Sequence, residues 1–305
     1  MAGGSRASAR ATPSPHAPLT DVRSAELILT LSCPDRRGIV HAVARAIADG
    51  EGNILDSQQF GDPDDGVFFM RVHFADEAAA GADAWRESFA PVAGEFSMAW
   101  ELHEASHRPR ILVAVSREGH CLNDLLYRCR SGAIPGDIVG VASTVADHEA
   151  LVAGYGVPFH LLPASDVDRE DRDRDLLDFV EATAAELVVL ARYMRVLGAE
   201  ACASLAGRAI NIHHSFLPSF KGARPYAQAH ARGVKLIGAT AHYVTEALDE
   251  GPIIEQEVAR VDHAHSVAEL ARVGRDVECV ALARAVRWHV EHRVLLHGDR
   301  TVVFR

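Results

Sequence analysis

Short apolar runs of strand type alternate with helical patterns through the middle of this chain. Such runs occupy residues 111–115, 137–142 and 187–190, and amphipathic or polar segments separate them. Each run has the length of a buried strand and is too short for a helix of its own. Strands that alternate with helices form a parallel sheet covered by helices on both faces. The pattern therefore predicts a Rossmann-like α/β domain with a mostly parallel sheet over residues 111–305.

A different pattern precedes it, over residues 25–104. Its order is strand, helix, strand, strand, helix, strand, at residues 26–33, 39–49, 54–61, 67–74, 76–90 and 95–103. This βαββαβ order is the ferredoxin-like plan. The polar stretch 105–110 is a plausible linker, and a length of 305 residues suits two domains.

Composition excludes several classes of protein. The net charge of −11 leaves no broad basic surface for nucleic acid. Apolar runs such as residues 187–191 are far shorter than the ~20 residues of a membrane span. The five cysteines are widely spaced and form no CxxC pair, so neither a disulfide framework nor a zinc site is indicated. A cytoplasmic protein fits this usage.

The first 24 residues are rich in Ala, Ser, Pro and Arg and hold no apolar signal-peptide core. We expect residues 1–24 to be a disordered tail. Because the segment is rich in Arg and Ser, an organellar transit peptide stays open as an alternative.

A polar cluster at residues 211–226 follows an apolar run, where ligands of parallel sheets bind. Asn211 and His213 are two apart, so on a strand they project to the same side. The histidine can move protons and the amide can donate to an oxyanion. Asp249 is the candidate to hold the histidine in one tautomer, although spacing alone does not place it there. His213 and His214 should diverge on a strand, which argues against a metal site.

The sequence NIHHSFLPSFKGARPY, followed by GATAHYVTEALDEGPII, resembles the formyltetrahydrofolate-dependent formyl-transfer family. The resemblance extends from about residue 26 to residue 305 and is closest to the deformylase branch. In addition, SCPDRRGIV resembles the first strand and loop of ACT domains, which stand in front of the hydrolase in that branch. The resemblance implies hydrolysis of 10-formyltetrahydrofolate to formate and tetrahydrofolate. It also implies a role in supplying formate to purine biosynthesis and in balancing the one-carbon folate pool.

The resemblance also implies roles for individual residues. His213 would activate water, Asn211 would stabilise the oxyanion and Asp249 would orient His213. The folate substrate would contact His214, His242, Tyr193, Met194, Gly222 and Arg224. His214 stands where related transferases carry proline. Tyr193 and Met194 could instead be core residues. No metal and no cofactor besides the folate substrate is expected.

The ACT-like loop implies regulation or assembly. Asp35, Gly38 and Ile39 would bind a small amino-acid effector, and a module that serves assembly alone is the alternative. Either case predicts a homo-oligomer, a dimer or a tetramer.

The acceptor of the formyl group is the main ambiguity. Transfer to an amine such as glycinamide ribonucleotide needs a Gly-rich phosphate cradle after the first strand of the domain. Residues 116–120 read SREGH, with a single glycine and an added acid, which favours water. A formyltransferase and a non-catalytic folate or amino-acid sensor remain alternatives. Ala227 and Thr144-Val145 depart from the His and Asn-His that deformylases carry.

Overall fold

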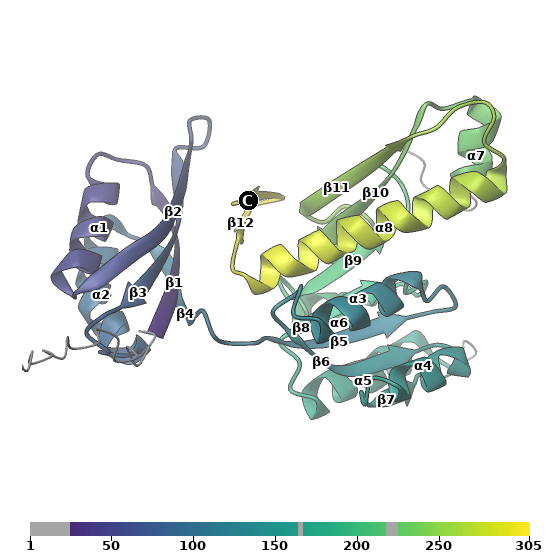
Figure 1. Cartoon of the computed structure of the whole chain (residues 1–305), viewed down its shortest axis with the longest axis horizontal. Helices are drawn as coiled ribbons and strands as arrows, with labels where there is room; N and C mark the ends of the chain where they lie inside the picture. The colour runs from purple at the N-terminus through teal and green to yellow at the C-terminus, as the bar shows by residue number, and fades with distance from the viewer. Residues whose placement is uncertain (1–24, 164–166, 218–224) are drawn as a thin grey trace, which may run out of the picture.

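The computed structural model describes residues 25–163, 167–217 and 225–305. Figure 1 shows two α/β domains joined by an extended segment after residue 104. The predicted tail, residues 1–24, lies outside the described residues. No helix of the described residues combines the length and the apolar character that crossing a membrane requires.

The N-terminal domain has the predicted ferredoxin-like order. Its sheet is antiparallel with the strand order β2-β3-β1-β4. Its elements are β1 (Ala25–Pro34), α1 (Ile39–Asp49), β2 (Gly52–Asp62), β3 (Val67–Asp76), α2 (Ala82–Phe96) and β4 (Ala99–Glu104). Helix α1 buries Ile39, Val43 and Ile47, which lie four apart on one face.

The limits of α2 differ from the sequence prediction. A helix was expected over residues 76–90, but α2 continues past Pro91 to Phe96. The Asp76 carboxylate accepts the backbone N–H groups of Ala80 and Gly81, so those residues form a turn before the helix. Apolar residues at helical spacing extend the buried face to Phe96. The strand expected from residue 95 therefore begins only at Ala99.

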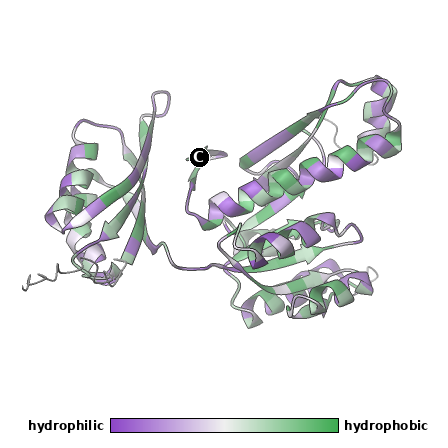
Figure 2. Ribbon diagram, in the orientation of Figure 1, coloured by the Kyte–Doolittle hydropathy of each residue, from purple (hydrophilic) through white to green (hydrophobic). Residues whose placement is uncertain are grey.

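The second domain contains the predicted, mostly parallel sheet, with the order β11-β10-β9-β8-β5-β6-β7. Strands β5 to β9 pair in parallel, and β10 and β11 are antiparallel. The strands are β5 (Arg110–Val115), β6 (Asp137–Ser143), β7 (Phe159–Leu161), β8 (Leu187–Ala191), β9 (Ala209–His213), β10 (Leu236–Tyr243) and β11 (Ile253–Arg260). Strand β5 begins within the predicted 105–110 linker, because Arg110 already pairs with Asp137. The apolar strands appear green in Figure 2.

Helices and a C-terminal hairpin complete this domain. They are α3 (His120–Arg130), the 3-10 turn η1 (Ala146–His148), α4 (Glu149–Ala153), α5 (Arg169–Ala182), α6 (Ala199–Ser204), α7 (Pro225–Arg232), α8 (Val267–Val290), β12 (Val294–His297) and β13 (Arg300–Val303). Helix α8 begins with a capping box between Ser266 and Glu269 and runs alongside β10 and β11 (Figure 1). Its apolar face packs on β9, β10 and β11.

The end of α8 is one place where the two domains meet. The buried Arg71 of β3 donates hydrogen bonds to the carbonyl oxygens of Glu291 and His292, just after the helix. The rings of His103 and His292 stack with their centroids 3.5 Å apart and 8° between their planes. The guanidinium and the stacked rings together join the N-terminal sheet to α8.

Candidate active site

The candidate site lies where β9 ends beside the antiparallel strand β10. The register places Asn211 directly opposite His242. The Asn211 Nδ2 atom lies 3.2 Å from His242 Nε2, and the Nδ1 of the same histidine lies 2.9 Å from the Tyr243 carbonyl oxygen. Because a carbonyl only accepts, Nδ1 carries the proton and Nε2 accepts from the Asn211 amide. Burial lowers the pKa of His242, which keeps this neutral tautomer.

This hydrogen bond fixes the Asn211 side chain. An amide group has two N–H donors, and His242 takes one of them. The second is available to a negatively charged oxygen in the adjoining cavity, which Asn211 lines. Asn211 therefore has the geometry of an oxyanion donor.

His213 is held by a carboxylate. Its Nδ1 lies 3.2 Å from the Asp249 Oδ2, and the ring is buried. The hydrogen bond from His213 lowers the pKa of Asp249, so the aspartate is ionised and accepts the Nδ1 proton. The Nε2 atom of His213 has no hydrogen-bond partner among the described residues. An unpartnered imidazole nitrogen in a cavity is what a general base needs.

The loop after β10 brings Asp249 to this position. Asp249 has a φ of 58°, a left-handed conformation that costs free energy for a residue other than glycine. Two residues later, a Cβ on Gly251 would lie 1.8 Å from the Tyr243 carbonyl oxygen. Only glycine lets the loop approach β10 so closely. The carboxylate consequently lies between two histidines, with Oδ1 3.9 Å from His242 Nε2.

These groups line a cavity of about 270 Å³. Its apolar wall includes Leu190, Tyr193, Met194, Val196, Leu197, Val244 and Leu248. Met194 is 63% exposed and Leu248 is 61% exposed, so two large apolar side chains stand at the surface beside a polar site. Such a combination suits a flat organic ring whose reacting atom reaches the histidine.

His214 also lines this cavity, but its orientation differs from the prediction. The two histidine rings do not diverge: they stack with their centroids 5.0 Å apart and 25° between their planes. The reason is that β9 ends at His213, so strand alternation no longer applies to His214. Burial, together with the charges of Arg192 and His213, lowers the pKa of His214 to about 4. His214 is therefore neutral at pH 7 and contributes an uncharged ring to the lining of the cavity.

The structure brings together Asn211, His213, Asp249, His242, His214, Tyr193 and Met194 around one cavity. Gly222 and Arg224 lie outside the described residues. Asp35, Gly38 and Ile39 belong to the other domain, and Gly38 precedes α1 with a φ of 98°. The ligand roles of all these residues stay predictions.

Two residues in or beside the site were not predicted from the sequence. Arg192 directly follows the buried strand β8 and lines the cavity. Glu278 is a fully buried acid on the apolar face of α8. The sequence does contain a signal for Glu278, because it lies beside Val277 and on the same helix face as Ala281 and Leu282. An acid on an apolar helix face is rarely buried unless it is paired, so this position predicts a buried partner.

Comparison with known proteins agrees with this geometry. Residues 109–286 match the family described as formyl transferase. A formyltetrahydrofolate deformylase from Corynebacterium sp. (strain P-1) is 50% identical over 279 residues, which cover 91% of this chain and 98% of that protein. A crystal structure of formyltetrahydrofolate deformylase from Burkholderia mallei covers 92% of this chain and 100% of its own, with 50% identity and a TM-score of 0.88.

A transferase matches less of the chain. Glycinamide ribonucleotide transformylase 1 from Symbiobacterium toebii covers 67% of this chain and 98% of its own, with 35% identity and a TM-score of 0.63. The chain therefore carries a formyl transferase domain and belongs to the formyltetrahydrofolate deformylase family.

Proposed function

We propose that this protein hydrolyses 10-formyltetrahydrofolate to formate and tetrahydrofolate. The observation that carries the proposal is the state of His213. Its Nδ1 is held 3.2 Å from the ionised Asp249, and its Nε2 has no partner among the described residues. The names of the relatives, formyltetrahydrofolate deformylases, support the same reaction.

The reaction begins with a water molecule between His213 Nε2 and the formyl carbon. The histidine takes a proton as the water oxygen bonds to that carbon, and Asp249 stabilises the imidazolium. The free N–H of Asn211 stabilises the tetrahedral oxyanion. The bond from the formyl carbon to N10 then breaks, and N10 receives the proton from His213. One water is consumed, and formate, a proton and tetrahydrofolate leave.

The apolar wall of the cavity would bind the folate. We assign the folate ring to the side with Tyr193 and the exposed Met194 and Leu248. His214 and His242 would line the polar side. Gly222 and Arg224, outside the described residues, keep the substrate contacts predicted for them.

The loop after β5 supports water as the acceptor of the formyl group. All three polar groups of Ser116 are used within the chain. Its N–H donates to the Arg192 carbonyl, its hydroxyl accepts the Met194 N–H, and its carbonyl accepts from His148 Nε2, at 3.3, 3.0 and 2.8 Å. A Cβ on Gly119 would lie 2.6 Å from the His148 ring, so that ring fills the space over the loop. A phosphate cradle needs free backbone N–H groups, which this loop does not offer at Ser116.

An assay without any amine tests the proposal. Purified protein and 10-formyltetrahydrofolate should give formate and tetrahydrofolate in equal amounts. A second reaction contains glycinamide ribonucleotide. If formate is absent and glycinamide ribonucleotide is formylated, the transferase is the correct function.

The N-terminal domain has a proposed role of its own. Asp35, Gly38 and Ile39 would bind a small amino acid, and a homo-oligomer, dimer or tetramer, would assemble in the cytoplasm. The formate would feed purine biosynthesis, and the reaction would balance the one-carbon folate pool. Turnover measured with added glycine and with added methionine tests the effector role. An unchanged rate with both would favour assembly alone.

A further inference from the structure

A buried carboxylate lies beside the catalytic cavity without a role in the hydrolysis above. The side chain of Glu278, on α8, is 1% exposed. Its Oε2 accepts from His120 Nε2 at 2.7 Å and lies 3.4 Å from Arg192 Nε. Its Oε1 accepts from the Tyr226 hydroxyl at 2.8 Å. We name His120, Arg192, Tyr226 and Glu278 the Glu278 cluster.

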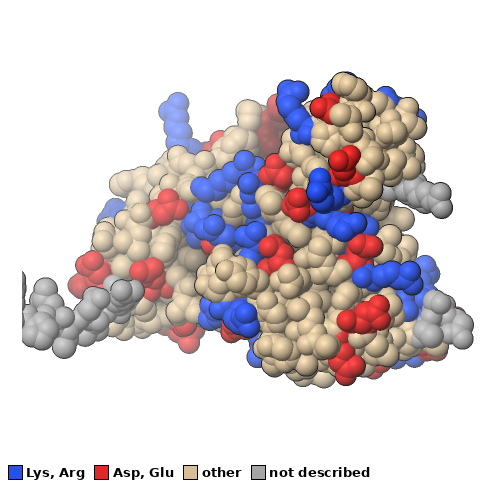
Figure 3. Space-filling view, turned by 45° about the vertical axis from the view of Figure 1, so that its right-hand side comes forward, with Lys and Arg blue, Asp and Glu red and all other residues tan. Residues whose placement is uncertain are grey.

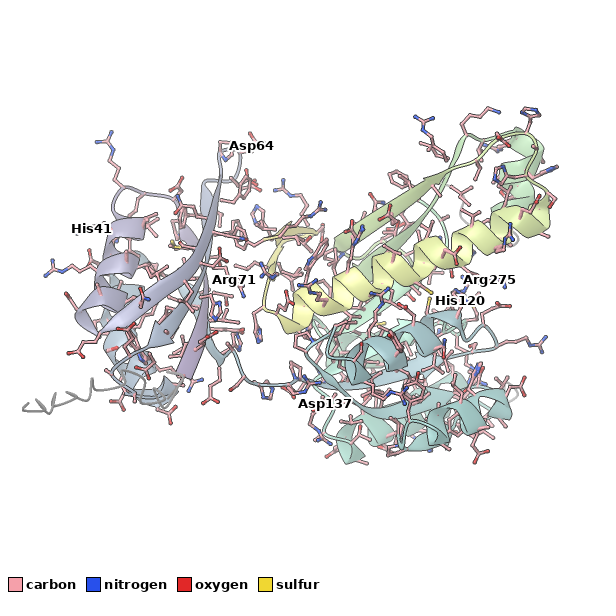
Figure 4. The ribbon with its side chains drawn as sticks, viewed as in Figure 1. His41, Asp64, Arg71, His120, Asp137 and Arg275 are labelled. Atoms are coloured by element: carbon pink, nitrogen blue, oxygen red, sulfur yellow. The ribbon has the colours of Figure 1, made fainter. Side chains whose placement is uncertain are left out.

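The Glu278 cluster joins four elements. His120 opens α3 directly after the 116–119 loop, Arg192 follows β8, Tyr226 lies in α7 and Glu278 in α8. Figure 4 shows His120 between α3 and α8. Burial raises the pKa of Glu278, but the hydrogen bond from His120 and the charge of Arg192 outweigh it and leave the pKa below its usual value. The carboxylate is therefore charged and attracts the Arg192 guanidinium as an ion pair, without a hydrogen bond to the Arg192 Nε atom among the described residues.

Arg192 has a backbone conformation that is uncommon for a residue with a large side chain. Its φ of 63° is left-handed, a conformation that glycine adopts without cost and that is strained for other residues. Its carbonyl is nevertheless fixed by Ser116, and its side chain is only 14% exposed. A strained arginine held at both its backbone and its side chain indicates a functional constraint.

Arg192 also borders the reacting groups. It lines the same cavity as Asn211, His213 and Asp249, and its charge acts on His214, whose ring stacks on His213. The cavity of about 270 Å³ lies just below the ~300–1,000 Å³ common for pockets that hold one drug-sized ligand. A formyltransferase must hold a folate and an organic amine at once. Arg192 is one of the residues that bound this small cavity.

We infer that Arg192, held by Glu278, determines the specificity for water by filling the space through which an amine would approach the formyl carbon. The inference rests on the proposed hydrolysis. In the excluded reaction, an amine nitrogen would bond to the formyl carbon, the bond from that carbon to N10 would break, and the amine proton would pass to N10. The products would be a formamide and tetrahydrofolate. Removing the guanidinium opens this route.

The test compares two products of one reaction. The Arg192→Gly variant is incubated with 10-formyltetrahydrofolate labelled with ¹³C in the formyl group and with an excess of glycinamide, a small primary amine. NMR measures the ratio of N-formylglycinamide to formate. We expect this ratio to rise at least ~10-fold over the parent, the order of discrimination that pocket size supplies. Arg117→Gly, which removes an exposed arginine from the neighbouring loop, is the matched control and should leave the ratio unchanged.

A second variant keeps the test decisive if Arg192→Gly does not fold. Glu278→Gln keeps the side-chain volume and the acceptor for Tyr226 but removes the charge that holds Arg192. Its ratio should rise less than that of Arg192→Gly. If Arg192→Gly does not fold, Glu278→Gln decides, and an unchanged ratio in it overturns the inference.

Three outcomes separate the possibilities. An unchanged ratio in folded Arg192→Gly overturns the specificity role. A folded Arg192→Gly that still quenches folate fluorescence but makes neither product also overturns it, since Arg192 would then be needed for the chemistry itself. A parent that makes no formate contradicts the proposed hydrolysis instead, whatever the ratio in the variants.

Discussion

The Nδ1 atom of His213 lies 3.2 Å from Oδ2 of Asp249, and the opposite ring nitrogen of this cavity-lining residue has no hydrogen-bond partner among the described residues. The carboxylate thus selects which nitrogen of His213 is free to accept a proton. A neutral imidazole could carry its proton on either nitrogen, and only one tautomer is a base toward the cavity.

Replacing this carboxylate should remove the selection. In Asp249→Asn we expect kcat to fall about 10²–10⁴-fold, because the asparagine amide can stabilise the wrong tautomer and cannot stabilise the imidazolium. KM should change little. Steady-state kinetics measure both constants, and Asp178→Asn, an exposed acid on α5, is the control. A variant with parental kcat would remove Asp249 from the mechanism.

Removing the proposed oxyanion donor should act on kcat as well. We expect Asn211→Ala to lose about 10²–10³-fold in kcat with a smaller effect on KM. The other partner of the amide gives a contrast: His242→Gln offers Asn211 an acceptor oxygen in place of Nε2 and should lose less activity. Equal losses in both variants would assign the main role to His242.

The loop that carries Asp249 depends on one glycine. A Cβ at residue 251 would lie 1.8 Å from the Tyr243 carbonyl oxygen, so Gly251→Ala must displace the loop or the end of β10. We expect a loss of kcat similar to that of Asp249→Asn and a loss of about 1–3 kcal/mol in stability. Thermal unfolding and kinetics measure the two effects. Gly94→Ala, where a Cβ meets no atom within 4 Å, should be neutral or stabilising. Full activity in Gly251→Ala would show that the loop adapts.

Half-buried histidines near the domain junction make stability depend on pH. Burial lowers the pKa of His289 to about 4, and its Nδ1 lies 2.7 Å from the Tyr243 hydroxyl. The unfolded chain, with a histidine pKa of about 6.5, binds protons more readily than the folded protein. Stability is therefore complete above about pH 6.5 and falls as the pH decreases toward 4, by about 2 kcal/mol at pH 5 for this one group.

The measurement is the unfolding midpoint at pH 7 and at pH 5 for the parent and for His289→Gln, which keeps a polar partner for Tyr243. The variant should lose less stability between the two pH values. An identical loss in both proteins would show that His289 is not the titrating group.

The sequence was sufficient for the folds of both domains and for the shared face of Asn211 and His213. Hydrophobic periodicity sets these features, and periodicity is local. Asp249 was a candidate partner from the sequence alone, but only the family resemblance assigned it to His213. No local pattern predicts the contact, because 35 residues lie between the two and Asp249 has a left-handed backbone. The stacking of His214 on His213 was missed because strand alternation ceases where β9 ends.

The Glu278 cluster shows a second limit. Its four members come from four elements, and each side chain alone is compatible with an ordinary surface or core position. Only the packing of α8 over the sheet brings Glu278 to Arg192. The net charge predicted the absence of a broad basic surface. On the face in Figure 3, basic and acidic side chains are interspersed over the second domain.

The hydrogen bonds of Arg71 to the carbonyls of Glu291 and His292 bear on how the chain would respond to a protease. A cut in the exposed segment after β4 would sever the covalent connection but not these bonds, nor the stacking of His103 on His292. The two fragments should therefore elute together from a sizing column under native conditions and separate only in denaturant. We expect cleavage at that point to leave the measured activity unchanged, so that only a denaturing gel would reveal it.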